Sequence, residues 1–175
     1  MLKNLLGELY ELGERDPETM GIYARTWMDS SLATGNLLHL RRSRDLYAEA
    51  FNASPSSDYA GINVAAKGVF LREQDTAKGF AQRVRAIVGD QAVAGDFWRT
   101  ATVAQVQLIQ GKFAEAAGQY LAAVAMSLGR TDDHRSSLTQ ANRLLEHLGA
   151  TSEEIALVRK AFAHLPPESV TSSRT

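Results

Sequence analysis

The sequence contains no cysteine, which excludes disulfide bonds, thiol nucleophiles and thiolate metal sites. Proline is also scarce: only four occur among 175 residues, and two of them form the pair Pro166–Pro167. The formal net charge is −1, so no overall field attracts nucleic acid or anionic membrane. No apolar run reaches the roughly 18–20 residues that a transmembrane helix requires. We therefore expect a cytoplasmic protein with neither a nucleic-acid partner nor a membrane partner.

Signals for β-sheet are nearly absent as well. No segment alternates β-branched and polar residues, and no Asn-Gly or Asp-Gly hairpin turn occurs. Apolar residues recur every three or four positions instead, which is typical of amphipathic helices. Helix-breaking residues divide the chain into an N-terminal helix and further helices over 17–34, 37–53, 58–71, 75–88, 96–110, 112–128, 133–148 and 152–164. This pattern predicts one all-α domain over 1–165, with about eight or nine helices in antiparallel pairs, and a polar, disordered tail over 166–175.

A repeat lies within this helical pattern. Residues 110–125, QGKFAEAAGQYLAAVA, match the second half of a tetratricopeptide repeat, with a turn glycine, an aromatic residue and alternating small and large residues on the second helix. Similar spacing recurs over 61–84 and over 43–55, which gives three degenerate helical hairpins. We therefore predict a tetratricopeptide-like stack, with an irregular helical bundle as the alternative. The repeat positions are Gly61, Ala65, Gly68, Ala104, Gly111, Phe113, Ala116, Tyr120 and Ala123.

The segment DYAGINVAAKGVF, residues 58–70, has two glycines inside an apolar run. A loop that binds an anion would have its glycines bunched at a helix start, with free backbone amides. Here Gly61, Ala65 and Gly68 are spaced so that they form a stripe of small residues along one side of a helix. Each glycine costs about 0.5–1 kcal/mol relative to alanine in a helix, so close packing must offset that cost. We predict a helix that packs tightly against its neighbour.

Several short motifs follow one another in a fixed order between residues 15 and 148: Pro17-Glu18-Thr19-x-Gly21; Tyr47, Phe51 and Pro55; Tyr59-x-Gly61-Ile62-Asn63-x-Ala65; Phe97-Trp98-x-x-Ala101-Thr102; Gly111 with Ala116; and Ser137-Leu138-x-Gln140 with Leu144-Leu145. Their order and spacing resemble the TRAFs-binding domain, a tetratricopeptide-like module of the central regulatory region of apoptosis signal-regulating kinases and of bacterial proteins. The chain departs from that pattern at Trp27-Met28-Asp29 and at Lys67 and Gly68. The resemblance implies a regulatory scaffold that binds other proteins, and it implies no catalytic activity.

Motifs for chemistry are missing from the sequence. There is no GxGxxG, Walker-type loop, HExxH or G-x-S-x-G, and the histidines at 39, 134, 147 and 164 are scattered. We interpret Asp132-Asp133-His134 as a helix start capped by aspartate rather than as a metal site. The basic run Arg41-Arg42-Ser43-Arg44 is interpreted as a solvated helix face. We therefore expect no catalytic residue, cofactor or metal, and an enzyme with a dispersed site is the less favoured alternative.

The sequence therefore favours a non-catalytic scaffold that binds a peptide or protein partner in a groove lined by the first helix of each hairpin. Asn63, Lys67, Arg99 and Gln105 are polar residues on those helices, and we predict that they bind the partner. The alternative is a self-associating accessory domain of a larger signalling protein. Its homo-oligomer would form through the apolar stripe of the first helix, which consists of Leu2, Leu5, Leu6, Leu9 and Leu12.

Overall fold

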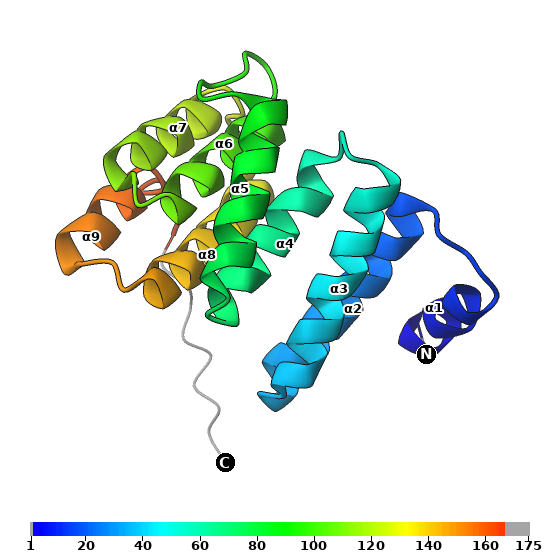
Figure 1. Cartoon of the computed structure of the whole chain (residues 1–175). Coiled ribbons are helices and arrows are strands. Elements are labelled where there is room, and N and C mark those ends of the chain that lie inside the picture. The colour runs from blue at the N-terminus through cyan, green and yellow to red at the C-terminus, as the bar shows by residue number, and fades with distance from the viewer. Residues whose placement is uncertain (1, 167–175) are drawn as a thin grey trace.

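The computed structural model describes residues 2–166, and this part of the chain contains nine helices and no strand (Figure 1). The all-α prediction is therefore confirmed. The tail predicted for 166–175 lies, apart from Pro166, outside the described residues. The helices are α1 (Leu2–Glu11), α2 (Pro17–Thr34), α3 (Leu37–Ala53), α4 (Asp58–Phe70), α5 (Gln74–Val88), α6 (Phe97–Ile109), α7 (Phe113–Ala125), α8 (Thr131–Leu148) and α9 (Ser152–Lys160).

Capping residues fix most of the helix boundaries. The Asp16 side chain accepts a hydrogen bond from the Thr19 amide at 2.9 Å, and Gly35 ends α2 in the left-handed conformation with φ 69°. A capping box of Thr151 and Glu154 starts α9. Since these signals are local in sequence, the predicted bounds of α2 and α3 agree with the structure at both ends.

The start of α8 differs from the prediction. The helix begins at Thr131, so Asp132 and Asp133 lie inside its first turn, and no side chain caps it. The capping interpretation of Asp132 and Asp133 is therefore wrong. Both carboxylates still lie at the positive end of the helix dipole, and Asp133 accepts a hydrogen bond from Arg130 Nε at 2.6 Å. Asp133 is therefore paired with a cation in the first turn of α8.

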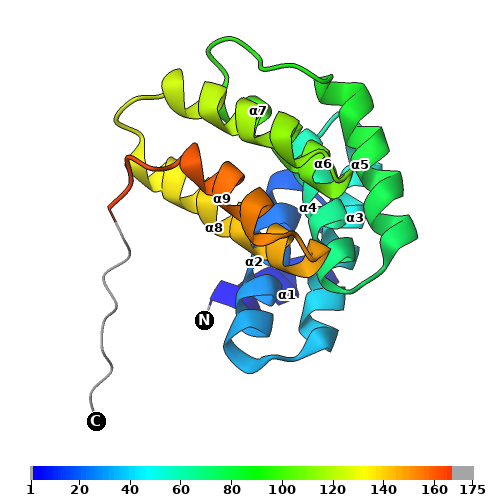
Figure 2. The same ribbon diagram turned by 90° about the vertical axis from the view of Figure 1, so that its left-hand side faces the viewer.

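Three helical hairpins, α2/α3, α4/α5 and α6/α7, stack in sequence order (Figure 1). Helix α3 packs on α4, and α5 packs on α6, so each hairpin contacts the next. Figure 2 shows α8 and α9 next to each other; α8 contacts the first helices α4 and α6, and α9 packs on α7. The tetratricopeptide-like architecture predicted from the spacing is therefore present.

The turns inside the second and third hairpins have the same geometry. Arg72 and Gly111, 39 positions apart, both have positive φ, at 60° and 75°. In each turn an amide bonds back to the carbonyl five residues earlier: Glu73 to Gly68 at 2.8 Å, and Lys112 to Gln107 at 2.9 Å. The buried second-helix positions Ala77, Ala81 and Val84 recur as Ala116, Tyr120 and Ala123 at the same 39-residue separation. These two hairpins are therefore structural repeats of one another.

Helix α4 is the centre of the molecule. Ten of its thirteen residues are buried, and it contributes to both hydrophobic clusters, one formed with α1–α3 and a larger one formed with α5–α9. Its glycines allow a close approach to α5. A Cβ on Gly61 would lie 2.5 Å from Val84 Cγ2, and a Cβ on Gly68 would lie 2.9 Å from the backbone nitrogen of Ala77. The small-residue stripe therefore serves packing, and it fixes where the remaining α4 side chains point.

None of the helices between residues 2 and 166 combines the length and apolar character that crossing a bilayer requires.

Candidate functional site: the inner groove

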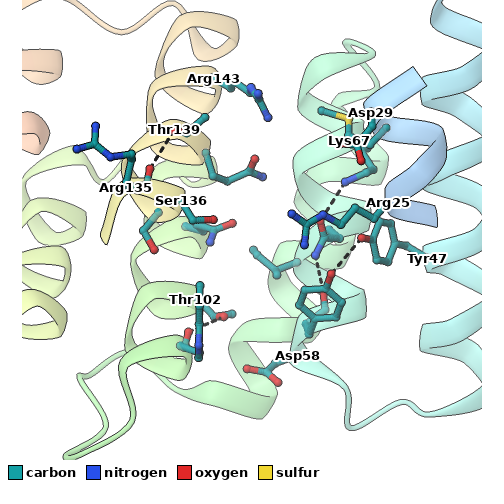
Figure 3. A pocket seen from close by; sticks show the side chains of 18 of the residues that line it. Arg25, Asp29, Tyr47, Asp58, Lys67, Thr102, Arg135, Ser136, Thr139 and Arg143 are labelled. Carbon is teal, nitrogen blue, oxygen red and sulfur yellow. Dashed lines mark hydrogen bonds between the residues drawn. The ribbon is translucent and has the colours of Figure 1, made fainter. Parts of the chain in front are cut away.

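A cavity of about 860 Å³ lies on the inner side of the stack. Its walls come from α2, α4, α6 and α8, with Tyr47 reaching it from α3 (Figure 3). The first helices of all three hairpins therefore line one groove, and α8 supplies the opposite wall. The volume falls in the range of about 300–1,000 Å³ that is typical of ligand-binding sites. We call this cavity the inner groove.

Lys67 is the most unusual residue of the inner groove. It is only 3% exposed, although it carries an ammonium group. The Nζ donates a hydrogen bond to Asn63 Oδ1 at 3.0 Å and lies 4.6 Å from the centroid of the Tyr47 ring. Burial, together with the positive charge of Arg143, lowers the pKa of Lys67 to about 7, while the negative charge of Asp29 opposes this shift. Lys67 is therefore a buried cation whose charged form is poorly stabilised.

A chain of hydrogen bonds holds the Lys67 wall in place. Asn63 accepts from Lys67 and donates through Nδ2 to the carbonyl of Tyr59 at 2.9 Å. The hydroxyl groups of Tyr47 and Tyr59 lie 3.2 Å apart, and their rings meet edge to face (Figure 3). Burial raises the pKa of Tyr47, so this hydroxyl stays protonated. The chain runs from α3 to α4 and orients Lys67 toward the groove.

Seven charged side chains line the groove, four positive and three negative. Among residues 2–166, none of the seven makes an ion pair within 4.0 Å. They are Arg25 and Asp29 on α2, Asp58 and Lys67 on α4, and Asp132, Arg135 and Arg143 on α8. The hydroxyl oxygen of Ser137, which also lines the groove and is 3% exposed, has no hydrogen-bond partner within the same described residues. The groove therefore offers charges and a donor that the fold itself does not use.

Three of the four residues predicted to bind a partner line the groove: Asn63, Lys67 and Gln105. Arg99 does not, because its guanidinium donates through Nη2 to the carbonyl of Ile87 at 2.5 Å, away from the cavity. We therefore leave Arg99 out of the site. The α8 residues Arg135, Ser137 and Arg143 were missed, since nothing in the local sequence indicates that α8 folds back against α4 and α6.

The basic run on α3 is used within the fold. Arg44 pairs with Asp45 and with Glu73, and Arg42 lies over the Tyr10 ring with its guanidinium carbon 4.8 Å from the ring centroid. The interpretation of the run as a solvated face holds for Arg41, which is exposed, but Ser43 is buried and Arg42 and Arg44 are only partly exposed. Neither Arg42 nor Arg44 lines the inner groove.

Two of the scattered histidines meet in the folded chain. His134 lies 2.8 Å from Ser127 Oγ through Nε2 and 2.9 Å from His164 Nε2 through Nδ1. Ser127 Oγ donates to the carbonyl of Ala123 at 2.7 Å, so it accepts from His134, and His134 Nδ1 in turn accepts from His164. The serine hydroxyl thus donates its proton to a backbone carbonyl and not to the histidine. The hydrogen bonds therefore have a structural role, and Ser127 is not an activated nucleophile. Among residues 2–166, no group of three or more His, Cys, Asp or Glu side chains is placed to hold a metal ion.

The hairpin stack and its groove define a tetratricopeptide-like helical repeat domain. Residues 2–71 match a family described as Tetratricopeptide Repeats-Sensor. The match covers α1 to α4, the part of the chain that supplies Lys67, Asn63 and the tyrosine pair, and it spans less than half of the chain. A search of curated proteins found no match.

Proposed function

We propose that this domain is a non-catalytic interaction module that binds a segment of a peptide or protein partner in the inner groove. The observation that carries the proposal is the set of seven unpaired charges on the groove walls among residues 2–166. Repeat stacks of this kind present an extended concave surface, and the similarity to a tetratricopeptide family supports the same use here.

The resemblance to the TRAFs-binding domain suggests a context for this function. In that context the domain is a regulatory part of a larger signalling protein, and binding in the groove regulates the remainder of the protein. The name of the matched family, which describes a sensor, is in line with such a role.

A peptide library displayed on phage tests the groove directly. Peptides selected on the wild-type protein are expected to bind the double variant Asn63→Ala, Gln105→Ala about tenfold more weakly or worse, because both side chains line the groove. The matched control is Lys78→Ala, an exposed residue of α5 that does not line the groove. Peptides that bind the double variant as tightly as the wild type would contradict the proposal, as would a selection that recovers none.

Self-association is a second candidate function, and exposed leucines favour it, two on α1 and one, Leu12, just after the helix ends at Glu11. Leu6 is buried, but Leu2 and Leu5 are more than half exposed and Leu12 is 85% exposed. A partner copy that covers these side chains would remove apolar surface from water. Light scattering of the wild type should then report a dimer that Leu5→Glu dissociates. A monomer at the highest accessible concentration would exclude this function.

A further inference from the structure

The ammonium of Lys67 is buried, and it contacts the neutral amide of Asn63 and the ring of Tyr47. Burial of a cation without a counter-ion costs free energy, and a lysine in such a place loses its proton or finds an anion. Among residues 2–166, no carboxylate lies within 4.0 Å of Nζ. The positive charge of Arg143 on α8 disfavours the charged form of Lys67 further. The fold therefore maintains a positive site that it does not neutralise.

We propose that Lys67 and Arg143 together bind an anionic group, a carboxylate or a phosphate, of the ligand that occupies the inner groove. The proposal rests on the proposed function, because it assigns a chemistry to one part of that groove. Figure 3 shows the two side chains entering the cavity from opposite walls, Lys67 from α4 and Arg143 from α8. An anion between them would be contacted from both sides.

The donors at this position suit an oxyanion. An ammonium has three donors, of which Lys67 gives one to Asn63, so two are left for a ligand. Arg143 is partly exposed, and its guanidinium fork is able to bind two oxygens of one carboxylate or phosphate. Carboxylates and phosphates accept several hydrogen bonds at once, whereas a neutral polar group would leave part of this donor set unused.

The negative residues of the groove limit what else the ligand carries. Asp29, Asp58 and Asp132 line the same cavity, and they repel a ligand of uniformly negative charge. We therefore expect an anionic group on a ligand that also has neutral or positive groups, as a peptide segment of mixed charge does. This charge pattern favours a peptide with one acidic side chain or one terminal carboxylate over a polyanion.

Binding of an anion next to Lys67 should be accompanied by proton uptake, which a purely structural role of Lys67 would not produce. The pKa of Lys67 in the free protein is about 7. The charged groups near it are Asp29 on α2 and Arg143 on α8, and the neutral hydroxyls of Tyr47 and Tyr59 lie on the same wall. An anion next to Nζ stabilises the ammonium and raises its pKa, so binding above pH 7 takes up a proton. The affinity should then fall as the pH rises from 7 to 9.

Calorimetry on the full chain tests the site with three probes that each carry one anionic group together with positive charge: phosphoethanolamine, glycylglycine and a capped peptide with one glutamate among glycines and lysines. We expect at least one probe to bind, with the affinity reduced about tenfold or more in Lys67→Met and in Arg143→Gln and unchanged in the control Lys78→Met. Binding of phosphoethanolamine alone identifies a phosphate site, and binding of glycylglycine or the peptide identifies a carboxylate site. Proton uptake is measured by repeating the titration at pH 7.5 in buffers of different ionisation enthalpy.

The proposal is overturned if none of the three probes binds the wild type, or if Lys67→Met and Arg143→Gln bind them as the wild type does. Circular dichroism establishes that each variant is folded, and Arg143→Gln, at a partly exposed position, provides the second test. Library-selected peptides separate this proposal from the proposed function. Peptides that need Asn63 and Gln105 but bind Lys67→Met unchanged leave the groove function intact and remove the anion site.

Discussion

Lys67 donates a hydrogen bond to the side chain of Asn63 one turn earlier on α4, with 3.0 Å between Nζ and Oδ1, at a site where the lysine is only 3% exposed. A neutral amide compensates an ammonium only in part, because no negative charge enters the buried site. The pairing therefore orients Lys67 without neutralising it. Sites that bind charged ligands commonly carry such a cost in stability, which the ligand removes when it binds.

The stability cost of Lys67 leads to the first prediction. Lys67→Met is expected to raise the free energy of unfolding at pH 7 by about 1–4 kcal/mol, because methionine fills a similar volume without a buried charge. Lys78→Met, at an exposed position of α5, should change it by less than about 0.5 kcal/mol. Urea denaturation followed by circular dichroism measures both. A less stable Lys67→Met protein would mean that the ammonium is well compensated, contrary to our interpretation.

Lys67 should also make the free energy of unfolding depend on pH. Lys67 has a pKa of about 7 in the folded protein and an ordinary value of 10.5 in the unfolded chain. Between these values the unfolded chain binds more protons, so the Lys67 contribution to the unfolding free energy rises with pH from 7 toward 10. The advantage of Lys67→Met over the wild type should therefore be largest at pH 7 or below and should shrink by pH 9.5. A difference that does not change with pH would refute the lowered pKa.

The glycines of α4 provide a matched pair of substitutions. In Gly68→Ala the new Cβ would lie 2.9 Å from the Ala77 backbone nitrogen, which has no room to move without separating α4 from α5. We expect a loss of about 1–3 kcal/mol. In Gly79→Ala, on α5, the Cβ meets nothing within 4 Å, so the higher helix propensity of alanine should add about 0.5–1 kcal/mol. Equal effects at the two positions would contradict the proposed role of the small-residue stripe.

Much of the fold was predictable because its signals are local. The Asp16-Pro17 start, the Gly35 stop and the Thr151–Glu154 capping box each lie within a few residues of the boundary that they set. The α8 wall of the groove was not predictable in this way. Its position depends on contacts with α4 and α6, which end 61 and 22 residues before α8 begins, and no local pattern on α8 encodes them.

The residues of the groove also divide into those that the local sequence pattern predicts and those that depend on distant contacts. Asn63, Lys67 and Gln105 line the groove because their helices have the repeat spacing, which places one side of each first helix on the concave surface; that they bind a partner stays a prediction. The burial of Lys67 was not anticipated, since a lysine in an apolar run resembles a surface residue until its neighbours are known. Arg99 was wrongly grouped with them, because one helix turn decides whether a side chain faces the groove or the carbonyl of Ile87.

The tie between His134 and His164 leads to the last prediction. Burial lowers the pKa of His134, and the charges of His164 and Arg130 act in the same direction against the opposing effect of Asp133. The unfolded chain, in which the histidine has its ordinary value of 6.5, therefore binds more protons on the acid side of that value, and stability is lost as the pH falls below about 6.5. The hydrogen bonds agree with this sign, because His134 Nδ1 accepts from His164 and has no place for a second proton.

Urea denaturation at pH 7.5, 6.5 and 5.5 measures this loss, and His134→Gln should reduce it because glutamine does not titrate. The Cε1 proton resonance of His134 provides a direct check, since its midpoint should lie below 6.5 in the folded protein. His164→Gln keeps His134 but removes the facing imidazole, so the midpoint should move up toward the ordinary value. If the titration midpoint of His134 is unchanged in His164→Gln, the two rings are not coupled. If the wild type and His134→Gln lose the same stability at acid pH, the pH dependence comes from other residues of the chain.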